Sequence, residues 1–206
     1  YSPADVIEIY SRPARYVENG EHVVREALSD PELIDFPGIG TLEAFNTDGL
    51  RTLAETIDAP NMKEKTLRYH GHIEKMAVLR AAGFFDEEAI EIDGHSIRPV
   101  DFTAKLLFPQ WQMEEGEVDI TVLQIIIEGE KNGTPRRFVY NLLDKYDAPS
   151  NTHSMARTTG YTATVAARML AKGLYDQTGI SPPEYVGRHQ ECVDFMLAGL
   201  AERGLV

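Results

Sequence analysis

Apolar residues change their spacing along the chain, and each spacing predicts a different element. From 118 to 130 they crowd into a β-branched run that includes Ile125-Ile-Ile127, which indicates a long strand. Asn132-Gly133 then predicts a tight turn into a partner strand over 136–146. A second hairpin is expected over 14–27 around Asn19-Gly20, with further strands over 40–45 and 62–69.

Helices are expected where apolar residues recur every three or four positions. The clearest is 72–82, where Ile73, Met76 and Leu79 share one face and Gly83 ends the helix. Other helices are predicted over 99–108, ended by Pro109, and over 153–172 and 189–203. Short helical segments are predicted at 4–10, at 182–184, and after Asn46-Thr-Asp48, where Asp48 is interpreted as a cap for a helix through Glu55.

Strands and helices alternate loosely, and both predicted hairpins are antiparallel. This order favours an α+β fold, with helices packed on a mixed, largely antiparallel sheet, over a doubly wound parallel sheet. Ser29-Asp-Pro31 and Phe36-Pro-Gly38 indicate loops. The chain has no Gly-rich phosphate loop and begins at Tyr1-Ser-Pro3 without Met, so any dinucleotide-binding domain is expected upstream of this fragment.

The acidic composition argues against two classes of partner. A formal net charge of −13 disfavours nucleic-acid backbones and anionic membrane surfaces. No apolar run reaches the roughly 18 residues that span a bilayer, and we expect no signal peptide. The single cysteine, Cys192, excludes an internal disulfide and favours a reducing compartment. We therefore expect a cytoplasmic protein with no nucleic-acid or membrane partner.

The first candidate for chemistry is Lys65-Thr-Leu-Arg-Tyr-His-Gly-His72, which spans a strand-to-helix junction. Arg68 could bind a carboxylate, and His70 or His72 could move a proton. The alternative is a surface arginine beside a capping histidine. A metal site is not expected, because no cysteine or carboxylate cluster joins the two histidines.

The second candidate is Met155-Ala-Arg-Thr-Thr-Gly160, at the start of the longest predicted helix. Arg157, Thr158 and Thr159 would place a cation and two hydroxyls beside free N–H groups, which suits an anion. The alternative is an N-capping threonine among small residues that allow close helix packing. Asp144 and Asp147 are interpreted as solvated charges at a strand end, and Trp111 as a packed aromatic or an interface anchor.

Taken together, these segments and Phe36-Pro-Gly-Ile-Gly-Thr-Leu-Glu-Ala-Phe-Asn-Thr-Asp-Gly-Leu50 resemble the saccharopine dehydrogenase / lysine 6-dehydrogenase family. The resemblance is to its C-terminal domain and covers essentially the whole chain. It implies one domain over 1–206, with a core over about 1–150 and a helical segment over about 151–206 that contacts a Rossmann domain. It also implies a homodimer, and NAD or NADP bound by that missing domain rather than by this fragment.

The resemblance implies an oxidoreductase that acts on the C–N bond of lysine or saccharopine, inactive as this fragment alone. In the matched segments it implies a small amino-acid substrate held by Arg68, Tyr69, Arg157, Thr158 and Thr159. The strand-to-helix junction itself supplies His70 and His72 as the candidate catalytic residues. Saccharopine-forming members are expected to have an arginine shortly after the early Ser-Pro. Ala4 and Asp5 occupy that place here, which favours a lysine-dehydrogenase-like substrate.

A rival hypothesis is a non-catalytic assembly or ligand-binding module that retains the fold. The sequence upstream of Tyr1 separates the two hypotheses, because a Gly-x-Gly-x-x-Gly loop between a strand and a helix would support the enzyme.

Overall fold

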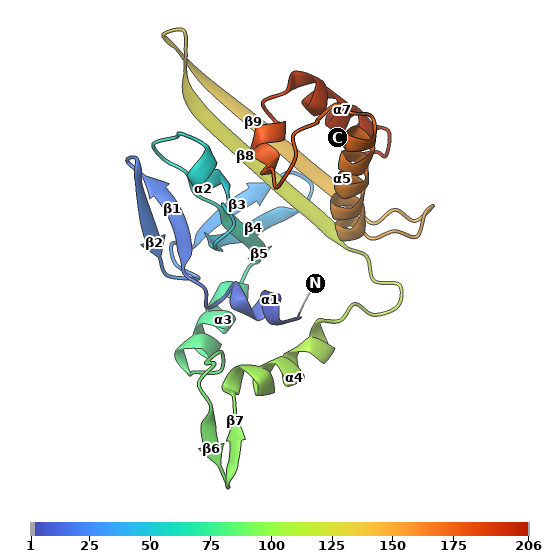
Figure 1. The fold of residues 1–206 in the computed structure, drawn as a ribbon. Coiled ribbons are helices and arrows are strands. Elements are labelled where there is room, and N and C mark those ends of the chain that lie inside the picture. The colour runs from blue at the N-terminus through green and yellow to red at the C-terminus, as the bar shows by residue number, and fades with distance from the viewer. Residues whose placement is uncertain (1–2, 206) are drawn as a thin grey trace. The chain divides into compact units, whose positions relative to one another are not determined.

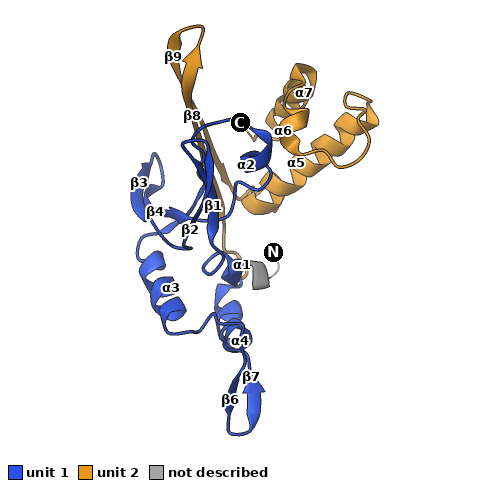
Figure 2. Ribbon diagram, turned by 60° about the vertical axis from the view of Figure 1, so that its left-hand side comes forward, with its two compact units in different colours: residues 1–112 blue, residues 113–206 orange. Residues whose placement is uncertain are grey.

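The structure is a computed structural model that describes the backbone of residues 3–205 and the side chains of residues 6–205. The chain divides into two compact units, residues 1–112 and 113–206, coloured separately in Figure 2. Ser2 lies outside the described residues, as do the side chains of Ala4 and Asp5, on which the substrate preference was predicted.

Unit 1 contains a three-stranded antiparallel sheet, two hairpins and three helices of six or more residues, shown in Figure 1. The sheet has the order β3-β4-β5 and the hairpins are β1-β2 and β6-β7. In chain order the elements are α1 (Pro3–Glu8), β1 (Ala14–Glu18), β2 (Glu21–Arg25), β3 (Glu32–Phe36), β4 (Gly40–Asn46), α2 (Leu53–Thr56), β5 (Lys65–Tyr69), α3 (His72–Ala81), β6 (Ile90–Ile92), β7 (His95–Ile97) and α4 (Pro99–Trp111).

The core of unit 1 forms where α1, β4 and α3 meet. Tyr10 is 1% exposed, and Phe45 of β4 is 0% exposed. Ile73 and Met76 bring the apolar face of α3 into the same cluster, as its spacing predicted, and Ala77 and Leu79 pack against it. The turn that follows α1 is therefore held inside the core.

In its described residues, unit 2 combines a long β-ribbon with three helices. β8 (Ile120–Lys131) and β9 (Thr134–Lys145) pair along their whole length, with Asn132 and Gly133 in the turn as predicted. Both turn residues have positive φ, 54° and 72°. The helices are α5 (Ser154–Ala171), α6 (Pro183–Val186) and α7 (Gln190–Ala201).

The predicted α+β class is confirmed, and the strand pairs of the described residues are all antiparallel. They form four separate sheets of two or three strands. No helix among the described residues is long and apolar enough to cross a membrane. The predicted division near residue 150 concerns contacts with a further domain and stays a prediction.

Three local predictions were wrong. β3 lies between the two predicted loops and went unpredicted, as did the hairpin β6-β7 around Asp93-Gly94. Pro109 does not end α4, which continues to Trp111. A proline lacks only its own backbone N–H, and at this position near the helix end few later hydrogen bonds of the helix depend on it.

Asp48 was also misassigned as a helix cap. α2 begins five residues later, at Leu53, and Asp48 instead accepts hydrogen bonds from Nε and Nη2 of Arg15 at 2.9 and 3.0 Å. This contact with the guanidinium lowers the pKa of Asp48 below its ordinary value. Asp48 therefore ties the start of β1 to the loop after β4.

We predict that Gly199→Ala destabilises unit 2. A Cβ at Gly199 of α7 would lie 2.6 Å from Cγ1 of Val165, a branched and fully buried residue of α5. Overpacking of this kind should lower the free energy of unfolding by about 1–2 kcal/mol after the gain in helix propensity. The matched control is Gly160→Ala on α5, where a Cβ meets nothing within 4 Å and should be neutral or slightly stabilising.

Urea unfolding of both variants checks the prediction. Equal stability of the Gly199 and Gly160 variants would show that α7 does not pack on α5 through this glycine.

Candidate functional site

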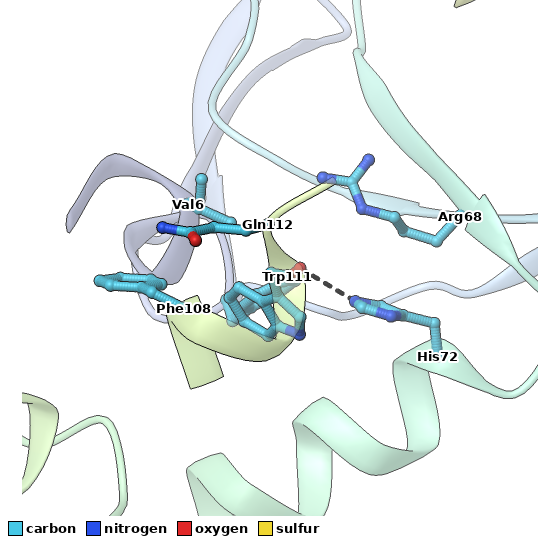
Figure 3. A pocket seen from close by; sticks show the side chains of 7 residues that line it. Val6, Arg68, His72, Phe108, Trp111 and Gln112 are labelled. Carbon is cyan, nitrogen blue, oxygen red and sulfur yellow. Dashed lines mark hydrogen bonds between the residues drawn. The ribbon is translucent and has the colours of Figure 1, made fainter. Parts of the chain in front are cut away.

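A pocket of about 650 Å³ opens in unit 1 at the end of α4 (Figure 3). Three parts of the chain supply its walls: α1 and the turn after it, the β5–α3 junction, and the C-terminal end of α4. The lining residues are Val6, Tyr10, Arg68, His72, Phe108, Trp111 and Gln112. Of the residues proposed from sequence, the pocket brings together Arg68 and His72.

The β5–α3 junction is fixed by Gly71 and by a carboxylate from the neighbouring strand. Gly71 has φ of 86°, a left-handed conformation that reverses the chain between Arg68 and the helix. As a glycine it offers no capping side chain, and Glu43 of β4 accepts the backbone N–H of Ile73 at 3.2 Å instead. Glu43 is paired with Arg68 in the β4-β5 register, so the strand pairing places the cap.

Burial raises the pKa of Glu43, but hydrogen bonds from the backbone N–H groups of Gly71, Ile73 and His72, together with the charge of His70, outweigh it. The net pKa lies below its ordinary value. Since the folded state binds this proton less tightly than the unfolded chain does, Glu43 stabilises the fold above its ordinary pKa. That stabilisation is lost as the pH falls through the lowered pKa.

The imidazole of His72 enters the pocket from the first residue of α3. Its Nε2 lies 2.9 Å from the hydroxyl oxygen of Tyr10, and the two ring centroids are 5.5 Å apart. Burial, followed by the charge of Arg68, lowers the pKa of His72 below 6.5. His72 is therefore neutral at neutral pH and available to accept a proton.

Arg68 presents a positive charge to the same pocket. Its Nη1 donates to the carbonyl of Leu67 at 2.8 Å. Among the side chains of residues 6–205, no carboxylate lies within ion-pair distance of this guanidinium, in contrast to the paired Arg15 and Arg157. Its remaining N–H donors can therefore receive the carboxylate of a ligand.

Aromatic rings form the opposite wall of the pocket. Trp111 meets Tyr10 edge-on at 6.5 Å between ring centroids, and Phe108 lies 5.9 Å from Trp111. Tyr10 also stacks on Phe85 at 5.9 Å, which anchors this wall in the core. Such a wall suits the aliphatic part of a ligand whose charged end lies at Arg68.

His70 and Tyr69 lie outside the lining of this pocket. The side chain of His70 is 69% exposed, with Nδ1 3.6 Å from Oε1 of Glu43. Tyr69 is 67% exposed. Their predicted catalytic and substrate-binding roles stay predictions, whereas the geometry favours His72 as the histidine of the site.

Arg157 lies in unit 2, where it is buried in a cluster of the chain's own acceptors. Its Nε is 3.2 Å from both carboxylate oxygens of Asp144, Nη1 is 3.6 Å from Asp147, and Nη2 donates to the carbonyl of Arg203 at 2.9 Å. Asp144 is 6% exposed, so the interpretation of Asp144 as a solvated charge was wrong. These contacts favour a structural role for Arg157.

Thr158 and Thr159 turn their hydroxyls back onto α5. They donate to the carbonyls of Ser154 and Met155 at 3.0 and 2.5 Å. The N–H groups expected to bind an anion at this helix start, those of Ser154 and Met155, donate to the carboxylate of Asp119 at 2.6 and 2.8 Å. A carboxylate of the chain itself thus occupies the predicted anion site, and the substrate roles of both threonines stay predictions.

Several residues of the pocket could not be found from sequence spacing. Tyr10 lies in the turn after α1, and Trp111 lies far along the chain at the end of α4. The interpretation of Trp111 as a packed aromatic is confirmed, since its ring packs on Phe108. Glu43 gave no signal, because its partners are backbone N–H groups of another element.

Comparison with known proteins places the chain in a family. The family model for the saccharopine dehydrogenase C-terminal domain matches residues 1–205, so the chain belongs to that family. Carboxyaminopropylagmatine dehydrogenase from Synechocystis sp. is 25% identical over 211 residues, which cover 100% of this chain and 52% of that protein.

Apo histidine-tagged saccharopine dehydrogenase (L-Glu forming) from Saccharomyces cerevisiae has a similar structure, with a TM-score of 0.77 at 17% identity. The match covers 100% of this chain and 60% of that one, and it shows the shared fold. The chain thus spans little more than half the length of two dehydrogenases.

We predict that Arg157→Ala acts mainly on stability. The substitution leaves the carboxylate of Asp144 buried without its partner, which should lower the free energy of unfolding by about 3–5 kcal/mol. Arg168→Ala on the same helix is the matched control, because Arg168 is 48% exposed and 3.9 Å from Glu202, and should change stability by less than about 0.5 kcal/mol.

Urea unfolding of the two variants decides between the roles of Arg157. If Arg157→Ala keeps normal stability while KM for an amino-acid substrate rises, Arg157 binds substrate and the structural account is wrong.

Proposed function

We propose that this chain is the substrate-binding part of an NAD(P)-dependent oxidoreductase that acts on the C–N bond of lysine, saccharopine or a related amine with an amino-acid group. The observation that carries the proposal is the pairing of Arg68 and His72 in one aromatic-walled pocket. Family membership supports it, because both relatives are dehydrogenases. The carboxyl and amino groups named in one relative's substrate suit a pocket that offers a cation and a neutral imidazole.

Arg68 would hold the carboxylate of the substrate. A guanidinium with free donors binds a carboxylate through charge-assisted, often bidentate, hydrogen bonds. Fixing that end of the molecule against Trp111 limits where its amine can lie, which is the main contribution of a positioning group to the rate. His72, which lines the same pocket as Arg68, then serves as the proton acceptor.

His72 would take the proton that an ammonium must lose before its carbon can be oxidised. Its lowered pKa keeps the imidazole neutral, and the positive charge of Arg68 contributes to that lowering. The charge of Arg68 therefore has two effects: it binds the substrate and it keeps the base unprotonated. A nicotinamide, when bound, supplies the hydride acceptor for the reaction.

The nicotinamide would bind to a domain outside this chain. The chain matches only 52% and 60% of the lengths of its two dehydrogenase relatives, which leaves room in proteins of that size for a separate dinucleotide-binding domain. The choice between NAD and NADP belongs to that domain.

Association of two copies is also part of the proposal, and the ribbon β8-β9 supports it. Ile125, Ile127 and Phe138 on one face, and Ile126 and Val139 on the other, are each between 44% and 53% exposed. An apolar two-stranded ribbon of this length is marginal in water without a covering partner.

We predict that Arg68→Met in the full-length protein lowers kcat/KM for the amine substrate by roughly 30- to 1000-fold. Losing a charge-assisted contact to a carboxylate costs about 2–4 kcal/mol of transition-state binding. The matched control is Arg98→Met, because Arg98 is 46% exposed in the same unit and outside the pocket lining, and this variant should keep normal kinetics.

The assay follows NAD(P)H with lysine and, separately, with saccharopine, alongside thermal melting. Near-normal activity of Arg68→Met on the substrate that wild type oxidises would remove Arg68 from the site. Loss of activity in both variants, or unfolding of the Arg68 variant, would also contradict the proposal.

A further inference from the structure

Tyr10 is buried more completely than any other residue that lines the pocket, being 1% exposed. Its ring lies among those of Phe45, Phe85 and Trp111, none of which accepts a conventional hydrogen bond. The hydroxyl of Tyr10 is therefore a polar group surrounded by aromatic rings. Nothing in the sequence around Tyr10 marks it for a role, and the proposed reaction needs no group from it.

Among the described residues, Nε2 of His72, at 2.9 Å, is the only hydrogen-bond partner of the Tyr10 hydroxyl. Two arrangements of hydrogen are compatible with this distance. If Nε2 carried the proton and donated to the tyrosine oxygen, the phenol proton would be left without an acceptor in an apolar surrounding. If the phenol donates to Nε2, its proton is satisfied and the neutral ring carries its own proton on Nδ1.

We propose that Tyr10 is a positioning residue, whose hydroxyl donates to Nε2 of His72 and holds the neutral imidazole as the Nδ1–H tautomer with its orientation in the pocket fixed. Nε2 is then the proton-accepting atom of the site. The effect of Tyr10 on the reaction rests on the proposed function of His72 as the base. The tautomer of His72 does not depend on that function.

A phenol suits this task because it can both donate and accept. When Nε2 gains a proton, the phenol hydrogen has to turn away from Nε2, and the tyrosine oxygen then accepts from the imidazolium. The two atoms stay in contact, but the phenol hydrogen loses its acceptor, which favours the neutral ring. The ring keeps the same place before and after protonation. A phenylalanine at position 10 would fill the same space without this contact.

The charged groups around His72 come from three elements. Arg68 of β5 and Lys75 of α3 favour the neutral ring, and Glu43 of β4 favours the charged one. Tyr10→Phe leaves all three in place. Removing the phenol removes a hydrogen bond that stabilises the neutral form, so the pKa of His72 should rise by about 0.5–1 pH unit.

The experiment is histidine-selective ¹⁵N NMR of the full-length protein, with the His72 signals identified by their loss in His72→Gln. Wild type should show the Nδ1–H tautomer. Tyr10→Phe should lose this preference, raise the pKa of His72, and move the acid limb of kcat/KM upward by the same amount. We expect kcat to fall about tenfold with KM nearly unchanged.

Two further variants keep the test decisive. Tyr146→Phe, which removes a hydroxyl bonded to Asn151 in unit 2 at 2.6 Å, should change none of these readouts. If Tyr10→Phe does not fold, 3-fluorotyrosine at position 10 provides a stronger donor of nearly the same shape and should lower the pKa of His72 instead.

An Nε2–H tautomer in wild type, or a His72 pKa that neither Tyr10 substitution moves, would overturn the positioning role of Tyr10. A shifted His72 pKa without any shift of the kinetic acid limb would uphold the contact and contradict the proposed role of His72 in the reaction.

Discussion

The carboxylate of Glu43 caps the N-terminus of α3. The positions of Arg68 and His72 in the pocket follow from that contact. Gly71 can make the left-handed turn from β5 into the helix, but it cannot satisfy the N–H groups that the helix leaves free. Glu43 satisfies them from the neighbouring strand. Because β4 pairs with β5 in a fixed register, the cap also sets Arg68 at the strand end and His72 at the helix start.

The same turn connects the pocket to the core. Ile73, one residue after His72, is buried beside Tyr10 and Phe45, so the helix cannot shift without disturbing both.

Arg68 and Arg157 show how differently two arginines can be used in one chain. Arg157 has its positive charge balanced by buried and half-buried aspartates of the chain, whereas Arg68 faces a pocket that has no carboxylate among its described lining residues.

Sequence patterns predicted the elements whose signals are local. The Asn-Gly turns, the β-branched run of β8 and the apolar face of α3 were each placed within a few residues. β3 was missed because it is short and lies between two proline-containing loops, and its pairing with β4 is what makes it a strand. The partner of Arg157 was missed because Asp144 lies on a strand, which helical spacing does not reveal.

The pocket itself was only half predictable. Arg68 and His72 come from one segment, and their chemistry could be read from it. Tyr10 and Trp111 are brought to them by tertiary packing, and nothing local in the sequence marks their association. The family resemblance covered the segment that supplies Arg68 and His72 to the pocket lining, but it did not distinguish His72 from His70, which lies outside that lining.

The most direct test of this account is a crystal structure of the full-length protein with its amine substrate bound. We predict a substrate carboxylate oxygen within about 2.7–2.9 Å of a guanidinium nitrogen of Arg68, with the substrate amine directed toward His72. A substrate whose carboxylate is held by another cation, with Arg68 turned away from it, would contradict the central claim.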